Sequence, residues 1–316
     1  MKEKGEIITI DGNEIALGKN AHIRCRVASL PSGTDIHINI HVYRSNKAGP
    51  KILLLGGLHG DEVNGVETVR RILSSKSLES LQRGTIIAIP LLNVYGFINF
   101  SRSVRDGKDV NRSFPGSKTG SLASRVAYMM SNHILPNIDY GIDFHTGGST
   151  IHNLPQLRVT QGDNAALELG RIFNPPVILQ NKAIPKSHRL HAFKLGKPIL
   201  VFEGGESLRL DEASIQMGIT GVHRILSHER MLSMPIDSEL TQEFEKSKWI
   251  RAYRSGLVNL KASSGSSVKK GQILAEIYQL DSLKKVSIKS PRDGLLIAHV
   301  NNPVVNRGDA LFHIVF

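Results

Sequence analysis

The chain has 316 residues and one cysteine, Cys25, so it is long enough to bury a large core but has neither an internal disulfide nor a thiolate-cluster metal site. No apolar run approaches the about 20 residues that a membrane-spanning helix needs, and the charged N-terminal stretch lacks the apolar core of a signal peptide, so we expect a cytoplasmic protein with no membrane partner. The net charge of +12 favours anionic partners, which include nucleic acid. Because the basic residues are scattered rather than grouped in blocks, a small acidic substrate fits this charge as well, and our expectation is a small acidic substrate and no nucleic acid.

The first fifty residues alternate between apolar and polar side chains in several places, which predicts short antiparallel strands leading into the main domain: 7–10, 22–27 and 36–43. Residues 52–55 are an apolar run that ends in Gly56-Gly57, a pattern typical of a buried strand that enters a tight turn. From residue 62 onward the apolar residues recur at helical spacing. The sequence therefore predicts a strand–loop–helix unit here.

The loop of this unit carries His59 and, three residues later, Glu62. Ligands of open α/β sheets bind at the carboxyl ends of the strands, and zinc accepts both imidazole nitrogen and carboxylate oxygen. A single His-x-x-Glu pair in a loop is most often solvated, although the glycines around His59 indicate backbone that lies close to a ligand. The metal interpretation therefore depends on a third ligand further along the chain.

Residues 85–92 are predicted to be a strand buried on both faces, because apolar residues do not alternate with polar ones. The polar segment 99–120 is predicted to be a long loop, and a loop of this length in a compact domain is usually functional or disordered. Guanidinium groups bind carboxylates through paired hydrogen bonds, and an Asn side chain adds a donor. The loop is thus either a solvated basic segment or a substrate-binding one that carries Arg102, Arg105, Asn111 and Arg112.

A helix is predicted at 121–135 and a strand at 140–144, and His145 follows this strand directly, next to Thr146 and two glycines. His145 supplies the third metal-ligand candidate, again an imidazole at the end of a strand. Asp143, on the same strand face, is predicted either to orient His145 or to hydrogen-bond at the strand end.

Helices are predicted at 165–173 and 187–196, and Arg158 is a further candidate for substrate contact. A strand at 198–202 is followed by Glu203, which is either a structural turn residue or a general base. The metal-ligand candidates favour the base, because a metal-activated water must lose a proton to attack. Two other acids are expected on the surface or at the start of the helix predicted at 211–226: Glu206 and Glu212.

From Trp249 the chain consists of short apolar runs separated by Gly, Ser, Asn and Asp at regular spacing, which predicts an all-β domain. Its two halves share a rough pattern that is similar to the barrel-sandwich hybrid of biotinyl and lipoyl carrier domains. We therefore predict a catalytic domain over residues 1–247 and a β domain over residues 248–316, folded outside the catalytic sheet.

Four motifs occur in order within residues 50–225: GGLHGDE, RSVRDGKDVNRSFPG, DFHTGG and FEGGE. Together they resemble the succinylglutamate desuccinylase and aspartoacylase family, which is related to zinc carboxypeptidases. The resemblance implies a mixed-sheet, zinc carboxypeptidase-like α/β/α domain, and members of the family also carry an appended β domain.

The same resemblance implies roles for individual residues. His59, Glu62 and His145 would hold one Zn²⁺ per chain, and Glu203 would be the general base and acid. Asn111 and Arg112 match the substrate-carboxylate clamp of the family. Arg102 is similar to the arginine that polarises the scissile carbonyl, and Arg105 is the second choice for that role.

The function implied is that of a zinc-dependent hydrolase that cleaves the linear, non-peptide amide bond of an N-acyl amino acid, as a deacylase or desuccinylase. Two alternatives remain open at this point. One is a metallocarboxypeptidase that trims acidic residues from short peptides, and the other is a non-catalytic binding module, against which the intact Glu203 argues. The acyl group, the amino acid and homo-oligomerisation are left open.

Overall fold

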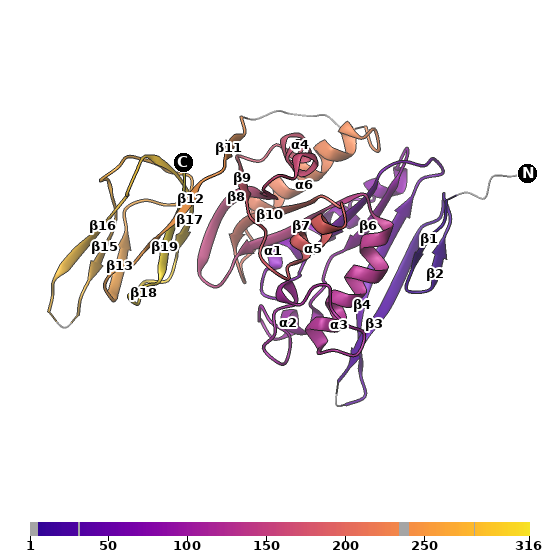
Figure 1. Cartoon of the computed structure of the whole chain (residues 1–316), viewed down its shortest axis with the longest axis horizontal. Helices are drawn as coiled ribbons and strands as arrows, with labels where there is room; N and C mark the ends of the chain where they lie inside the picture. The colour runs from indigo at the N-terminus through magenta and orange to yellow at the C-terminus, as the bar shows by residue number, and fades with distance from the viewer. Residues whose placement is uncertain (1–5, 31, 234–239, 281) are drawn as a thin grey trace, which may run out of the picture.

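The computed structural model describes residues 6–30, 32–233, 240–280 and 282–316. Within these residues a long mixed sheet runs through the molecule, helices cover it on both faces, and a smaller all-β part lies at one end (Figure 1). The main path of the sheet has the order β12-β19-β17-β8-β10-β7-β5-β6-β4-β3. The predicted class, an α/β fold with a mixed sheet and a C-terminal all-β part, is confirmed. No helix in the described ranges is long and apolar enough to cross a membrane.

The centre of the sheet is parallel and buried. Its strands are β5 (Lys51–Leu55), β6 (Thr85–Ile89), β7 (Tyr140–Gly147) and β10 (Ile199–Glu206), and β5 lies between β6 and β7. Leu53 and Leu55 pack into the core on one face, whereas Ile52 and Leu54 pack into the core on the other. Because both faces are covered, the strand has no need of polar alternation, which explains the continuous apolar run.

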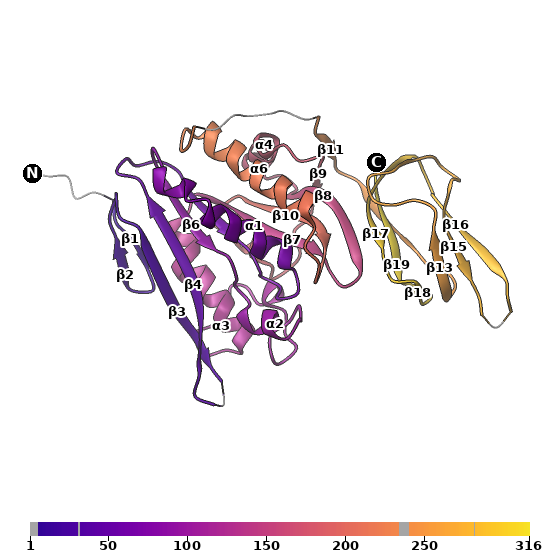
Figure 2. The same cartoon turned by 180° about the vertical axis from the view of Figure 1, so that it is seen from behind.

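Two groups of helices cover the two faces. On one face lie α1 (Val63–Ser74), α4 (Asn164–Phe173) and α6 (Glu212–His228), whose apolar residues share one core cluster. Figure 2 shows α1 and α6 in front of the sheet. On the other face lie α2 (Val94–Ile98), α3 (Leu122–Met129) and α5 (His188–Lys194) (Figure 1). Short 3₁₀ or π turns complete the helical content: Ser77–Ser80, Val110–Arg112, Met130–Ile134 and Leu135–Asn137.

The N-terminal strands extend the sheet, as predicted. β3 (Ala21–Ser29) and β4 (Asp35–Arg44) form an antiparallel pair, and β4 joins the centre by antiparallel pairing with β6. β1 (Ile8–Ile10) and β2 (Asn13–Ile15) make a separate two-stranded sheet. The helix predicted at 121–135 is also present, although it changes from α to π geometry after Met129.

Before the C-terminal part, four strands of the described residues were not predicted: β2, β8 (Ile151–Thr160), β9 (Val177–Asn181) and β11 (Gln242–Phe244). The sequence of β8 mixes Pro155 with several polar residues and shows no clean period, so tertiary pairing rather than pattern makes it a strand. β8 pairs antiparallel with β10, and β7 and β10 run further than predicted. His145 and Glu203 therefore lie within strands, paired with each other across β7 and β10, and not after them.

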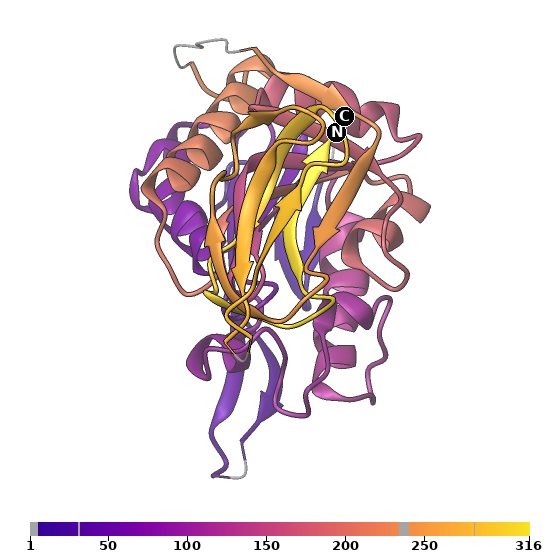
Figure 3. The ribbon, with the colours of Figure 1, turned by 90° about the vertical axis from the view of Figure 1, so that its left-hand side faces the viewer.

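The C-terminal residues form two packed antiparallel sheets, which Figure 3 shows in front of the rest of the chain. One sheet contains β13 (Gly256–Leu260), β15 (Ile273–Tyr278), β16 (Lys285–Lys289) and β18 (Val304–Val305). The other side is formed by β12 (Ser247–Arg251), β14 (Ser267–Val268), β17 (Gly294–Val300) and β19 (Ala310–Val315). Residues of both share one core, for example Ile277 of β15 and Phe312 of β19.

The expectation that this part folds outside the catalytic sheet is wrong. β17 pairs antiparallel with β8, with Ala298 opposite Asn153 and Val300 opposite Ile151, so one sheet continues through the junction. An apolar cluster also spans the junction and joins β9 to β17 and β19. The reason is that β9 pairs only with residues 156–160 on this edge of β8, and β17 pairs with residues 151–153, whose backbone groups would otherwise have no strand partner there. The division at residue 248 stays a prediction about sequence organisation.

Glu206 was expected on the surface or at a helix start, and this is also wrong. It is 7% exposed and accepts a hydrogen bond from the side chain of Asn301, which follows β17. β10 extends to Glu206 and carries this carboxylate into the junction. Glu212, in contrast, is the first residue of α6, as predicted, and forms an ion pair with Arg71.

The junction cluster generates a test of fold stability. Ile297 is fully buried in this cluster, and its replacement by Ala should lower the free energy of unfolding by about 2–5 kcal/mol, because a cavity replaces packed atoms. Leu257→Ala is the matched control, since Leu257 lies in the same C-terminal part but is 41% exposed, and it should cost about 0.5 kcal/mol or less. Urea unfolding measures both. Equal midpoints for the two variants would contradict a shared core at the junction.

Candidate metal and catalytic site

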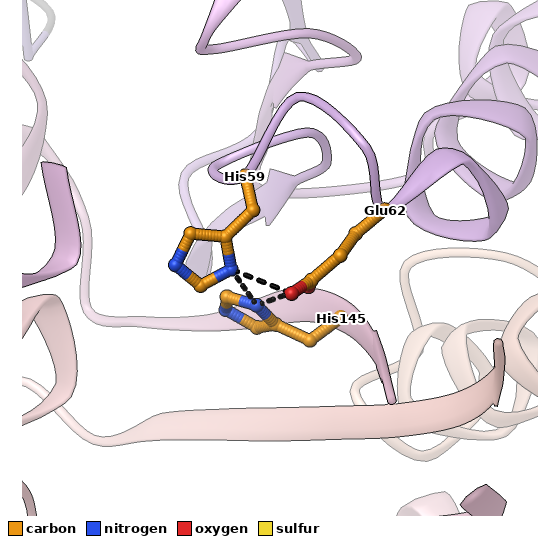
Figure 4. A group of neighbouring side chains, drawn as sticks. All are labelled: His59, Glu62 and His145. Carbon is orange, nitrogen blue, oxygen red and sulfur yellow. Dashed lines mark hydrogen bonds and ion pairs between the residues drawn. The ribbon is translucent and has the colours of Figure 1, made fainter. Parts of the chain in front are cut away.

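The three predicted metal ligands meet at one edge of the sheet (Figure 4). His59 lies in the loop after β5, Glu62 immediately precedes α1, and His145 lies near the end of β7. β5 and β7 are adjacent and parallel, so their carboxyl ends lie at the same edge. Because of this pairing, Glu62 and His145 are in direct contact although they lie 83 residues apart in the sequence.

The geometry of the three side chains is compact. Nδ1 of His59 lies 2.8 Å from Oε1 of Glu62, Nδ1 of His145 lies 2.8 Å from Oε2 of Glu62, and the two Nδ1 atoms are 3.2 Å apart. The three residues are at most 4% exposed. Two imidazole nitrogens and a carboxylate oxygen that converge in this way are a donor set that zinc accepts, and three protein ligands leave a fourth position for water.

Glu62 is unusual among the residues that precede the helices. Ser121, Asp163, Ser187 and Asp211 each accept a hydrogen bond from the backbone at the first turn of their helix, which is the ordinary role of an N-cap. Glu62 holds the corresponding place before α1 but makes no such bond. Its carboxylate is instead directed to the two histidines, which indicates that this position serves the site rather than the helix.

The glycines around His59 were expected to let the backbone lie close to a ligand, but the structure gives a different reason for them. A Cβ atom on Gly60 would lie 2.0 Å from the backbone of Gly96, and one on Gly56 would lie 2.6 Å from the carbonyl oxygen of Gly65. Backbone, rather than a ligand, therefore crowds the loop. The close approach holds His59 in a fixed position against α1 and α2.

Carboxylates face the outer nitrogens of both histidines. Nε2 of His145 lies 3.2 Å from Asp143, whose other oxygen lies 3.0 Å from Nδ1 of the buried His188. Nε2 of His59 lies 3.3 Å from Asp109. A carboxylate at the outer nitrogen orients an imidazole and increases the basicity of the nitrogen that faces the metal. The orienting role predicted for Asp143 fits this geometry, and Asp109, although it stands in the Asp-x-Asn-Arg motif, was missed.

The charges of the buried groups compensate one another. Burial alone lowers the pKa of His59 and His145, but the charges of Glu62 and of the outer carboxylates outweigh it, so both pKa values are raised. Burial raises the pKa of Glu62, and the two histidines more than reverse this, which holds the pKa well below its usual value. Protons on the two histidines supply the positive charge that balances these carboxylates. A divalent cation would supply the same charge, and its binding would release those protons.

Glu203 lies beside the three ligands because of strand register. It is directly opposite His145 in the parallel β7–β10 pair, and residues opposite each other in a sheet point to the same face. Its carboxylate accepts a hydrogen bond of 2.9 Å from Asn153 and lies 3.2 Å from the guanidinium of Arg158, both on β8. Asn153 could not be found from the sequence, because β8 itself was not predicted.

The basic loop brings most, but not all, of its predicted residues to the site. Arg102 lies 3.2 Å from Glu62 and 3.0 Å from Asp109, directly beside the ligands. Asn111 accepts a hydrogen bond from the backbone of His188 and, with Arg112, lines the cavity described below. Arg105 is exposed and borders a separate hollow near β3, so the structure does not place it at this site. The loop turns between Val104 and Lys108, which directs Arg105 away.

These side chains surround a cavity of about 270 Å³. Its polar wall includes the metal-ligand group, Glu203 and four arginines: Arg102, Arg112, Arg158 and Arg189. Its apolar wall consists of Ile151, Ile184, Val201 and Trp249, the last contributed by β12. Arg189 and Trp249 were not predicted to lie at the site. Arg189 stands in a predicted helix and Trp249 in the predicted β domain, and neither pattern indicates that the side chain lines this cavity.

Arg189 and Arg158 retain buried donors for a ligand. Among the described residues, Nη1 of Arg189 and Nε of Arg158 are buried without a hydrogen-bond partner. Burial, helped by the charge of Arg158, lowers the pKa of Arg189 to about 10, so it stays cationic at neutral pH. Because a buried donor without a partner costs free energy, this pair favours an anionic group in the cavity.

The chain resembles known proteins across most of its length. The family model described as succinylglutamate desuccinylase/aspartoacylase catalytic domain matches residues 48–229. N-alpha-acetyl-L-2,4-diaminobutyric acid deacetylase from Halomonas elongata is 28% identical over 278 residues, which cover 83% of this chain and 81% of the relative.

Solved structures share the fold. The product-bound structure of the ectoine utilization protein EutE (DoeB) from Ruegeria pomeroyi has a TM-score of 0.86 at 24% identity, with 99% of each chain covered. A succinylglutamate desuccinylase/aspartoacylase from Rhodobacter sphaeroides also has a TM-score of 0.86, at 23% identity, with 95% of this chain and 97% of that chain covered. The similarity therefore includes the C-terminal strands.

The outer carboxylates generate a prediction about metal affinity. Asp109→Asn keeps a side-chain oxygen that can accept from the backbone of Asn111 but removes the charge facing His59, so the affinity for Zn²⁺ should fall roughly 10–100-fold. Asp106→Asn, an exposed acid in the same loop, is the matched control and should bind Zn²⁺ like the unaltered protein. Competition with a chromophoric chelator measures both constants. Unchanged affinity in Asp109→Asn would show that this carboxylate does not support the site.

Proposed function

Because the chain belongs to the succinylglutamate desuccinylase and aspartoacylase family, we propose that it is a zinc-dependent enzyme that deacylates a small N-acyl amino acid. Membership of this family makes the chain a hydrolase of amide bonds. The observation that carries the finer proposal is the convergence of His59, Glu62 and His145 within 2.8–3.2 Å, next to Glu203, in an arginine-rich cavity.

His59, Glu62 and His145 would hold the zinc ion, which when bound supplies Lewis-acid activation of water and of the scissile carbonyl. Glu203 accepts the proton of the attacking water and passes it to the nitrogen of the leaving amine. Asn153 and Arg158 hold the Glu203 carboxylate in place for both transfers. Arg102, beside the ligands, donates to the carbonyl oxygen as that oxygen gains negative charge.

The substrate carboxylate is bound by the basic wall of the cavity. Arg112 and Asn111 line the cavity together with the metal-ligand group. Arg158 and Arg189 each have a buried donor without a partner in the part of the chain that the structure describes. When these residues hold the substrate carboxylate in a fixed position, the amide carbonyl lies next to the reacting groups. The energy of carboxylate binding is thus used to orient the substrate for reaction. A substrate with one or more carboxylates fits this wall, which supports an N-acyl amino acid.

The size of the cavity also bears on the carboxypeptidase alternative. About 270 Å³ is small for a ligand site, and Trp249 of β12 closes part of the wall. A cavity of this volume matches a small N-acyl amino acid better than several residues of an extended peptide. The structure thus favours a small substrate over the trimming of peptides.

A hydrolysis screen tests the proposal. The protein is stripped with a chelator, reloaded with Zn²⁺, and assayed for release of primary amine from N-acetyl and N-succinyl amino acids, including N-acetyl-diaminobutyrate, and from short acidic peptides. We expect hydrolysis of at least one N-acyl amino acid that requires Zn²⁺. Hydrolysis of the peptides alone would support the carboxypeptidase alternative, and no hydrolysis at all would contradict catalysis.

Glu203→Gln separates catalysis from binding. The substitution keeps size and polarity but removes the group that takes up the proton, so kcat should fall roughly 10²–10⁴-fold. Zinc content should stay at one ion per chain, because Glu203 is not a ligand, and Glu212→Gln, on the exposed start of α6, should retain full activity. Steady-state kinetics and metal analysis measure these effects. A Glu203→Gln enzyme with normal kcat and normal zinc would remove Glu203 from the mechanism.

Two arginines of one loop provide a matched pair. Arg112→Ala should raise KM roughly tenfold or more with zinc content unchanged, because a contact to the substrate carboxylate is lost. Arg105→Ala, which removes the same charge from an exposed position outside the cavity, should leave kcat and KM unchanged. The comparison excludes a general effect of net charge. Similar kinetics for the two variants would argue against the clamp.

A further inference from the structure

Trp249 is the one cavity-lining aromatic side chain among the described residues, and it comes from the C-terminal strands rather than from the catalytic part. We infer that Trp249 is a specificity-determining residue, whose indole contacts an apolar part of the amino acid that leaves as the amine. This inference rests on the proposed function, because it assigns the substrate of the same cavity. It gives the C-terminal strands a direct part in substrate selection.

The position of Trp249 follows from strand register across the junction. Trp249 of β12 is opposite His313 of β19, His313 is opposite Ala298 of β17, and Ala298 is opposite Asn153 of β8. Residues opposite each other point to the same face, so this row faces the side of the sheet on which Asn153 contacts Glu203. Three strand spacings, about 14 Å in total, separate Trp249 from Asn153. Both of these residues line the cavity.

The indole is held as a fixed surface. Its ring stacks on the imidazole of His313, with centroids 4.3 Å apart and an angle of 7° between the planes. His313 is 6% exposed, and burial, followed by the charge of Arg158, lowers its pKa to about 3. The imidazole is therefore neutral at physiological pH and packs against the indole as an uncharged ring. A side chain that is already ordered loses little conformational entropy when a ligand packs on it.

The surroundings of Trp249 identify the chemistry of its ligand. Ile184, which is 47% exposed, and Val201 also belong to the apolar wall of the cavity. A cationic group would approach the guanidinium groups of Arg158 and Arg189, whereas carboxylates have these arginines as partners. The group of the substrate that contacts the indole is therefore an uncharged aliphatic or aromatic one.

The chemistry of the reaction indicates which end of the substrate reaches Trp249. Glu203 delivers a proton to the leaving amine, so the amino-acid part lies on the Glu203 side of the scissile bond. Glu203 is paired with Arg158, and both line the cavity together with Trp249, which stacks on His313. The amino-acid side chain, rather than the acyl group, therefore extends toward the indole.

Two substrate series test this inference in the zinc-loaded enzyme. One keeps the acetyl group and lengthens the amino-acid side chain, from N-acetylalanine through N-acetylnorvaline to N-acetylnorleucine. The other keeps alanine and lengthens the acyl group from acetyl to butyryl. Trp249→Ala should lower kcat/KM for N-acetylnorleucine roughly tenfold more than for N-acetylalanine, because an apolar contact is lost. Trp249→Phe should retain most of the preference for N-acetylnorleucine over N-acetylalanine. In the acyl series, Trp249→Ala should change kcat/KM by the same factor at every acyl length.

Controls and a second readout keep the test decisive if Trp249→Ala is poorly folded. Tyr253→Ala removes an exposed aromatic of the same region outside the cavity and should leave both series unchanged. Trp249 is the only tryptophan of the chain, so tryptophan fluorescence reports on this side chain alone. In the Glu203→Gln variant, this fluorescence should change when N-acetylnorleucine binds, and calorimetry measures the binding independently.

Binding seen by calorimetry with no change in fluorescence would overturn the inference and leave the proposed function intact. An equal loss across the side-chain series, or a loss confined to the acyl series, would also overturn it. If the unaltered enzyme hydrolyses no compound of either series or of the wider N-acyl amino acid screen, the proposed function fails, and the inference fails with it.

Discussion

The parallel pairing of β5, β7 and β10 is the constraint on which the site depends. Adjacent parallel strands end at one edge of the sheet, and their register decides which side chains stand together there. Glu203 lies beside His145 because these residues are opposite each other, and His59 and Glu62 reach the same place from the end of β5. A shift of one residue in either pairing would turn the side chains to the opposite face and dismantle the site.

Buried charge is the second feature of this edge. The three ligands, the outer carboxylates and the nearest arginines are stable together because each charged group lies against groups of opposite sign, as the raised pKa values of the histidines and the lowered pKa of Glu62 reflect. The cavity beside them differs, since Arg158 and Arg189 each have a donor that lacks a partner within the described ranges. The ligand group thus suits a cation, whereas the cavity suits an anion, and a carboxylate-bearing substrate of a metal enzyme requires both.

The C-terminal strands complete this arrangement. β17 pairs with residues 151–153 of β8, and β8 carries both Asn153 and Arg158, the residues that contact the Glu203 carboxylate. The same continuous sheet carries Trp249 to the cavity. The C-terminal part therefore pairs with the central sheet and also contributes to the wall of the cavity, which an independent accessory domain would not do.

Local pattern was sufficient to predict the class of the fold and the three residues that converge at the candidate metal site. The strand before His59, the helix after Glu62 and the all-β C-terminal part are local features, and motif order indicated His145 and Glu203. Pattern could not reveal β8, because its strand structure comes from pairing with β10 and β17, nor place Asn153, Arg189 and Trp249 at the cavity. It also misplaced Arg105, because the direction of a side chain in a long loop depends on backbone turns that spacing does not encode. Tertiary pairing alone decided these positions, since contacts between residues distant in sequence leave no period in the chain.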